Sequence, residues 1–116
     1  MRHLKKGKKF HRRKGQRRAL FKILLNNLIF KEKIESTEAK AKEIKKMAEK
    51  LITIGKKQNL SGLRLLLSRL PKKAALKVYY ELSLRYQNRS GGFCRVVKIA
   101  KTRKNDGAKM AMIEFV

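Results

Sequence analysis

Residues 88–99, NRSGGFCRVVKI, mark the place where the hydrophobic pattern of this chain changes. Before Asn88 the apolar residues recur every three or four positions, which is typical of amphipathic helices. After Gly92, residues 93–99 alternate between two faces, as the residues of a half-buried strand do. A chain that begins with helices and ends with strands is typical of the α+β class.

The expected sheet is small, mixed and made of about three strands. A second strand is expected at residues 109–116, after a connection that contains Asn105-Asp106-Gly107. These residue types tolerate the positive φ angles of tight turns, so the two strands should form an antiparallel hairpin with a basic tip. Because an isolated hairpin is only marginally stable, residues 33–37 are expected to supply a third strand. The helices should pack on one face of this sheet.

The helix expected after residue 37 has the clearest apolar face in the chain. Ser36 or Thr37 offers a side-chain oxygen that can cap it, and Glu38 suits the positive first turn. Gly55 is expected to end it. Five of the eight acids lie between Glu32 and Glu49, so the remaining surface of this helix mixes acids with lysines, which favours a packing element with a solvated outer face.

Three further helices are expected. They cover residues 16–30, residues 63–70 and the stretch after Pro71, whose fixed φ angle suits a first helical turn. In the last of these, Tyr79 is expected in the core and Tyr80 and Tyr86 at the surface.

The charge balance predicts a polyanionic partner. The 116 residues include 33 Lys and Arg against 8 Asp and Glu, which gives a net charge of +25. Contacts with phosphates relieve the resulting self-repulsion and release condensed cations to the solvent. Nucleic acid is therefore the first expected partner, and an anionic membrane surface the second. No stretch approaches the roughly 20 apolar residues of a membrane-spanning helix.

The first eighteen residues, MRHLKKGKKFHRRKGQRR, contain ten Lys or Arg and no acid. We expect an extended basic arm over residues 1–15, followed by a single globular domain over residues 16–116. The arm also contains arginine, histidine and the aromatic residue Phe10, whose side chains can stack on unpaired bases. Folded RNA presents such bases and duplex DNA does not, so these residues favour RNA. A solubilising or nuclear-targeting tail is the alternative. The arm's candidate RNA contacts are Arg2, His3, Lys5, Lys6, Lys8, Lys9, His11, Arg12, Arg13, Lys14, Arg17 and Arg18.

A second basic group surrounds the turn at Ser90-Gly91-Gly92. Two residues without a Cβ let the backbone approach a phosphate and offer its N–H groups. The alternative, compatible with the first, is that the glycines only let the chain turn into the strand. The candidate contacts of this group are Arg89, Ser90, Gly91, Gly92, Arg95, Arg103 and Lys104.

Catalytic, metal and cofactor sites are not expected. His3, His11 and the single cysteine, Cys94, match no metal-ligand spacing, and no phosphate-cradling loop or nucleophile elbow occurs. Cys94 is expected to be a small apolar group in a strand with no lowered thiol pKa. We expect no enzyme, no small-molecule substrate and no homo-oligomer.

Several segments together resemble the bacterial large-subunit ribosomal protein seventeen family. They are Arg2-His3, Arg17-Arg18-Ala19-Leu20-Phe21, Ile34-Glu35-Ser36-Thr37, Ala39-Lys40-Ala41-Lys42-Glu43, Ala48-Glu49-Lys50-Leu51-Ile52-Thr53, Arg89-Ser90-Gly91-Gly92-Phe93-Cys94-Arg95, Asp106-Gly107-Ala108 and Met110-Ala111. No single piece is diagnostic, but their order and spacing are, and they span nearly the whole chain.

The resemblance implies a structural protein of the large ribosomal subunit in the cytoplasm. It implies binding to large-subunit (23S) rRNA near the exit-tunnel mouth on the solvent side, with other large-subunit proteins as neighbours and a role in subunit assembly. It also supports the α+β fold and the arm's role as an rRNA-embedded extension. Two alternatives of other classes are a membrane-active cationic protein, suggested by the amphipathic helices, and a DNA-compacting protein.

Overall fold

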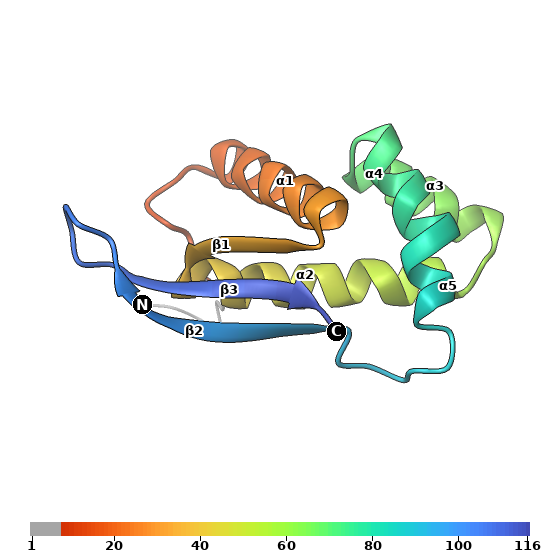
Figure 1. Cartoon of the computed structure of the whole chain (residues 1–116). Coiled ribbons are helices and arrows are strands. Elements are labelled where there is room, and N and C mark those ends of the chain that lie inside the picture. Colours follow the sequence, from red (N-terminus) through yellow and green to blue (C-terminus); the bar gives the residue numbers. More distant parts are fainter. Residues whose placement is uncertain (1–7) are drawn as a thin grey trace, which may run out of the picture.

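A three-stranded antiparallel sheet carries the fold (Figure 1). The computed structural model of the chain describes residues 8–116. Strand β3 (Lys109–Phe115) lies between β1 (Lys33–Thr37) and β2 (Cys94–Thr102). The predicted α+β class with three strands is confirmed, but both strand pairings are antiparallel rather than mixed. The reason is that β3 folds back in a hairpin with β2 and enters between the two other strands.

The helices observed correspond to the expected ones, with shifted ends. They are α1 (Lys14–Lys31), α2 (Glu38–Lys56), α3 (Leu60–Arg69), α4 (Lys72–Lys77), the π-helical turn η1 (Val78–Leu82) and α5 (Ser83–Arg85). The last three form one continuous helical stretch that follows Pro71, as expected.

The core lies between α2 and one face of the sheet. Helix α2 contributes Ala41, Ile44 and Ala48 to this core. Strand β3 contributes Ala111 and Ile113, and all five residues are at most 2% exposed. Figure 1 shows α2 running along the sheet behind β3. The apolar face expected for this helix is thus confirmed as its packing face.

Side-chain caps set where two helices begin. Thr37 Oγ1 accepts a hydrogen bond from the Lys40 amide at 3.5 Å, so Thr37 is the cap expected at Ser36 or Thr37. Asn59 Oδ1 accepts from the Gly62 amide at 2.7 Å. Helix α3 therefore begins at Leu60, three residues before the expected start, because Asn59 caps it.

Neither Gly15 nor Gly55 limits a helix, although Gly55 is the expected end of the helix after residue 37. Helix α1 begins at Lys14, so Gly15 lies within its first turn instead of interrupting it. Helix α2 runs through Gly55 to Lys56. Glycine lowers helix propensity by only about 1 kcal/mol, which tertiary packing readily overrides.

The π-helical turn is closed by a buried hydroxyl. Ser83 is fully buried, and its Oγ donates to the Val78 carbonyl oxygen at 2.6 Å. The same carbonyl oxygen also accepts from the Ser83 amide, the bond that defines the wider turn, so the hydroxyl is a second donor to it.

Tyr86 belongs to the core and not to the surface. It is 5% exposed, and its ring centroid lies 5.4 Å from that of Phe93. Its Oη donates to the Val116 carbonyl oxygen at 2.6 Å. The expected surface position is wrong because the chain turns back after α5 and lays Phe93 over the tyrosine. Tyr79 packs against the core only in part, and Tyr80 is exposed as expected.

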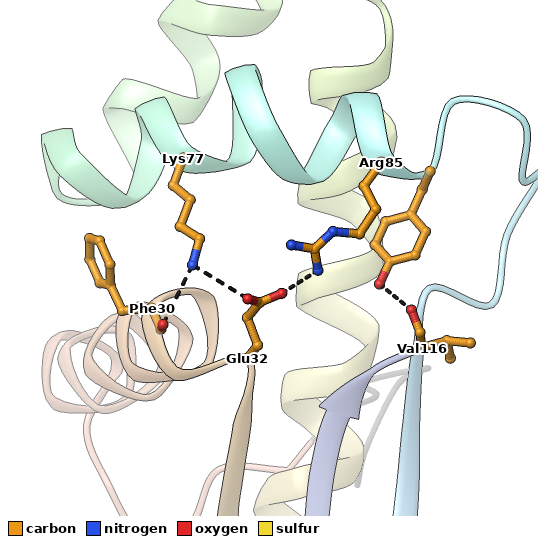
Figure 2. Close-up of polar contacts among 6 residues, drawn as sticks. Phe30, Glu32, Lys77, Arg85 and Val116 are labelled. Atoms are coloured by element: carbon orange, nitrogen blue, oxygen red, sulfur yellow. Dashed lines mark hydrogen bonds and ion pairs between the residues drawn. The ribbon is translucent and has the colours of Figure 1, made fainter.

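Glu32 links the end of α1 to the helical stretch that contains α4 and α5 (Figure 2). It caps α1 in the left-handed conformation, with φ at 62°, and its amide donates to the Leu28 carbonyl at 2.7 Å. Arg85 donates to Glu32 Oε1, and Lys77 Nζ lies 3.9 Å from Oε2. The hydrogen bond from Arg85 holds the pKa of Glu32 below its ordinary value, against the opposing effect of burial.

Candidate nucleic-acid interface

The described part of the arm, residues 8–13, is fastened to the domain by Phe10. The ring of Phe10 packs edge-on against Phe21 of α1, with the centroids 5.6 Å apart. Phe10 and His11 both have φ at 53°, and Arg12 Nη1 donates to the Phe10 carbonyl at 2.8 Å. This tight turn directs the partly buried Phe10 against the core, so a ring that is expected to stack on RNA bases is held by the protein itself.

Four of the arm's candidate contacts, Arg2, His3, Lys5 and Lys6, lie outside the described residues. Lys8, Lys9, His11 and Arg13 are exposed, and Arg12 is partly buried. The last three candidates, Lys14, Arg17 and Arg18, lie in the first turns of α1 and not in an extended segment.

The cations at the start of α1 are placed against the helix dipole. No acid occupies the first turn, where acids are favoured; Lys14 and Arg17 lie there instead, and Arg18 directly follows. Each such cation is disfavoured by about 0.3–1 kcal/mol at the positive end of a helix. The arrangement lowers the stability of the isolated chain and creates a strongly positive surface.

Lysines of α2 join the arm to form a groove that sequence reasoning missed. Two adjoining hollows, of about 380 and 510 Å³, both include Lys8 of the arm and Lys42 of α2. We call them together the arm–α2 groove. Its basic lining residues are Lys8, Lys42, Lys45, Lys46 and Lys109. Since Lys8 and α2 are brought together only by the fold, the lysine spacing of α2 gave no signal beyond a solvated helix face.

Acids within the arm–α2 groove reduce its net positive charge. Lys42 Nζ lies 2.9 Å from Glu38 Oε1, and Lys46 Nζ lies 3.4 Å from Glu43 Oε1. The hydrogen bond from Lys42 lowers the pKa of Glu38, so this carboxyl stays ionised at pH values below its ordinary pKa. Lys8 takes part in none of the ion pairs found among residues 8–116.

The glycine turn before β2 is partly occupied by the protein's own groups. The Gly92 amide donates to Glu49 Oε2 at 3.1 Å, and Lys56 Nζ donates to the Arg89 carbonyl oxygen. Gly92 has φ at +65°, which accounts for its role in turning the chain. Gly91 has no such φ, and a Cβ built there meets no atom within 4 Å. The close-approach interpretation therefore stays open for Gly91, whereas the turn interpretation accounts for Gly92.

The hairpin tip is organised by an arginine–aspartate pair. Arg103 Nε donates to Asp106 Oδ1 at 3.0 Å, and its Nη2 donates to Oδ2. These bonds lower the pKa of Asp106 to about 2. Arg103 thus orders the tip, while Lys104 beside it is exposed. Arg95, further along β2, donates to Glu114 Oε1 at 2.7 Å.

The second basic group of the sequence is divided by the structure. Arg89, Ser90, Gly91 and Gly92 precede β2, whereas Arg103 and Lys104 follow it. A nine-residue strand spans roughly 30 Å. Figure 1 shows the hairpin tip and the loop before β2 at opposite ends of the sheet. One phosphate cannot contact both sets.

The described residues offer no grouping of His, Cys, Asp and Glu suited to a metal ion. Cys94 is 3% exposed, and burial raises its thiol pKa to about 12. The expectation of an unactivated thiol in a strand is confirmed. Within residues 8–116 no helix has the length and hydropathy to cross a bilayer.

Comparison with known proteins identifies the family. A family model described as Ribosomal protein L17 matches residues 20–116. The chain belongs to the ribosomal protein L17 family. A "Large ribosomal subunit protein bL17" of Hydrogenobaculum sp. (strain Y04AAS1) is 45% identical over 100% of this chain and 99% of the relative. Relatives of the same name are 47% identical in Persephonella marina and 43% in Sulfurihydrogenibium sp. (strain YO3AOP1), covering 95% and 97% of those proteins.

Membership in this family makes the chain a ribosomal protein, a structural component of the large subunit and not an enzyme. The resemblance recognised in the sequence is thereby confirmed. The matches to curated relatives extend over the whole chain, so they include the arm that precedes the family match at residue 20.

Proposed function

We propose that the chain binds large-subunit (23S) rRNA and supports assembly of the large subunit. The observation that carries the proposal is the uneven distribution of ion pairs. Nine Lys and Arg lie between Lys8 and Lys31, and Glu32 is the first acid in the chain. Of the ion pairs among residues 8–116, none uses a cation before Lys33. These nine charges therefore need a partner from outside the chain.

The acids are already engaged elsewhere. Six of the eight take part in ion pairs with cations from Lys33 onward, and Glu49 accepts from the Gly92 amide. A phosphate backbone along the start of α1 would offset the unfavourable interaction of Lys14 and Arg17 with the helix dipole. The arm and the arm–α2 groove are thus the first proposed rRNA surface.

The loop before β2 and the hairpin tip are proposed as two separate further contacts. Arg89 and Gly91 serve the first, and Lys104 serves the second. The division into an arm over residues 1–15 and a domain over residues 16–116 is retained, although α1 already begins at Lys14. We further infer from the family resemblance a position near the exit-tunnel mouth on the solvent side of the cytoplasmic ribosome, beside other large-subunit proteins.

Salt dependence tests the proposed mechanism. If about 6 to 10 phosphates are neutralised, affinity for an isolated large-subunit rRNA fragment falls by on the order of 10³ to 10⁵ between 50 and 200 mM salt. Filter binding of the full chain measures this slope. A flat salt response would refute phosphate neutralisation.

Competition separates the proposal from the two alternative functions. Excess duplex DNA should displace the chain poorly from structured rRNA, and anionic vesicles should not retain it when ribosomal subunits are present. Efficient displacement by DNA would favour a DNA-compacting protein. Recovery with vesicles and not with large subunits would favour a membrane-active one.

A further inference from the structure

A groove between α1, α2 and α3 lies apart from the surfaces described above. Its volume is about 530 Å³. The floor is formed by Leu25 of α1 and by Met47 and Leu51 of α2. Leu25 and Leu51 are largely buried members of the core, whereas Met47 packs against the core and stays partly accessible. The floor is therefore an apolar surface open to a ligand at its centre.

The rim of this groove carries three exposed cations, Arg18, Lys22 and Arg69. Arg18 and Lys22 lie one turn apart on α1, and Arg69 ends α3. No acid lines the groove, and no ion pair within residues 8–116 uses any of the three. In the arm–α2 groove, by contrast, acids lie among the lysines. Uncompensated positive charge thus borders an apolar floor.

A second hollow of about 240 Å³ continues the groove across α1. It shares Ala19 and Lys22 with the first and adds Ile23, Asn26 and Pro71. Ile23 is 60% exposed, so this hollow also presents apolar surface to the solvent. The two adjoining apolar hollows therefore share Lys22, while Arg18 and Arg69 border the first.

We propose that this groove binds unstacked nucleotides of single-stranded RNA, with a base on the floor at Met47 and phosphates on Arg18 and Arg69. The proposal rests on the rRNA-binding function proposed above. A duplex presents phosphates but keeps its bases stacked, whereas an unpaired segment presents both. Arginine suits this position because its planar group can hold a phosphate by two hydrogen bonds or stack on a base. The volume lies within the range of about 300–1,000 Å³ found for small-ligand sites.

An acidic peptide with apolar side chains is the other partner that such a groove could accept. The observations favour RNA because three cations, none in an ion pair among residues 8–116, are spaced around an apolar floor, which suits the phosphates and unstacked bases of a single strand. A peptide would have to match that spacing with successive acids. It is kept as an outcome of the test.

Methyl NMR of the full chain with labelled methionines tests the groove. The probe is a single-stranded adenosine tetranucleotide RNA, and Met110 and Met112 of β3 serve as internal references. An aromatic base on the floor shifts the Met47 methyl resonance by its ring current and leaves both references in place. A fully paired RNA duplex should leave Met47 unshifted.

Two variants separate the rim from the floor. R18Q/R69Q should raise the tetranucleotide concentration for the half-maximal Met47 shift by at least about tenfold, because two charged hydrogen-bond donors are lost. The control K57Q/K73Q removes the same charge from exposed positions outside the groove and should change this concentration by no more than about twofold. Ala19→Leu keeps every charge but narrows the groove and should abolish the shift. Unchanged Met110 and Met112 resonances show that each variant is folded.

Three results would overturn the proposal. They are an unshifted Met47 with the single strand, an equal shift with the duplex, and tighter binding of a glutamate-rich peptide than of RNA at Met47. Filter binding of the same chain to the rRNA fragment distinguishes the two proposals. If the chain binds the rRNA fragment but the Met47 methyl resonance does not shift with the single strand, only the groove proposal is refuted. If the chain does not bind the rRNA fragment, the proposed function is refuted.

Discussion

Gly55 of α2 lies directly beneath Ser83 at the end of the π-helical turn. A Cβ at position 55 would stand 3.2 Å from the Ser83 Cβ and 3.5 Å from Val78 Cγ1, and it would overlap the Ser83 hydroxyl. That hydroxyl is fixed by its bond to the Val78 carbonyl. The absence of a side chain at Gly55 therefore lets the η1–α5 helical segment approach α2 closely.

Gly55→Ala should consequently destabilise the protein by about 1–3 kcal/mol, because overpacking outweighs the gain in helix propensity. Urea unfolding measures the change. Gly15→Ala is the matched control, since Gly15 also lies in a helix and a Cβ there meets no atom within 4 Å. It should stabilise by about 0.4–1 kcal/mol. Equal effects of the two substitutions would contradict the close packing at Gly55.

The ionisation of Asp106 should report the order of the hairpin tip. Its pKa is about 2 in the folded chain against an ordinary value of 3.8, mainly because of the hydrogen bond from Arg103. A lowered carboxyl pKa stabilises the fold above the ordinary value, and this contribution is lost as the pH falls from about 4 toward 2. R103Q should raise the titration midpoint of Asp106 toward 3.8 in carboxyl-detected NMR. R95Q, which disturbs Glu114 instead, should leave that midpoint in place.

Cys94 should be unreactive in the folded protein. Burial raises its thiol pKa to about 12, so almost no thiolate exists at pH 8, and the sulfur is also shielded from reagents. Reaction with an aromatic disulfide reagent should be at least about 100-fold slower in the native chain than in guanidinium chloride. Similar rates in both conditions would mean that the start of β2 opens readily.

The charges of the arm should contribute to rRNA binding independently of the Phe10–Phe21 contact that holds the arm on the domain. K8Q/K9Q/R13Q leaves Phe10 on Phe21 and should lower the salt-dependence slope of rRNA binding by about 2 to 3. The variant K50Q/K57Q/K73Q removes as many charges from exposed sites outside the arm and should retain the original slope. An equal reduction in both variants would assign the binding to net charge alone.

Local signals in the sequence predicted most of the fold. The alternation after Gly92 predicted β2, and the capping oxygen expected at Ser36 or Thr37 predicted the start of α2. Asn59 offers an equally clear capping signal for α3, but the leucine pattern from Leu63 predicts a later start. The start of α1 was not readable, because a helix that begins with cations contradicts the usual preference for acids.

Contacts between distant segments were the part that could not be predicted. The residues around Tyr86 in the sequence do not indicate that its ring packs against Phe93. They also do not indicate that its hydroxyl donates to the Val116 carbonyl oxygen. The meeting of Lys8 with the α2 lysines likewise depends on the turn at Phe10. The arm was recognised from its composition, but the groove that it completes was not.

The central place of β3 has a consequence for the order in which this protein can mature. Both β1 and β2 pair with β3, the strand nearest the C-terminus. During synthesis, β1 emerges some seventy residues before the partner that satisfies its backbone, and β2 waits for the same segment. The helices can form as they appear, but the sheet closes only when residues 109–115 are released. Until then, β1 and β2 have unpaired edges that can pair with other chains and aggregate. Early binding to a partner would protect the chain from that aggregation.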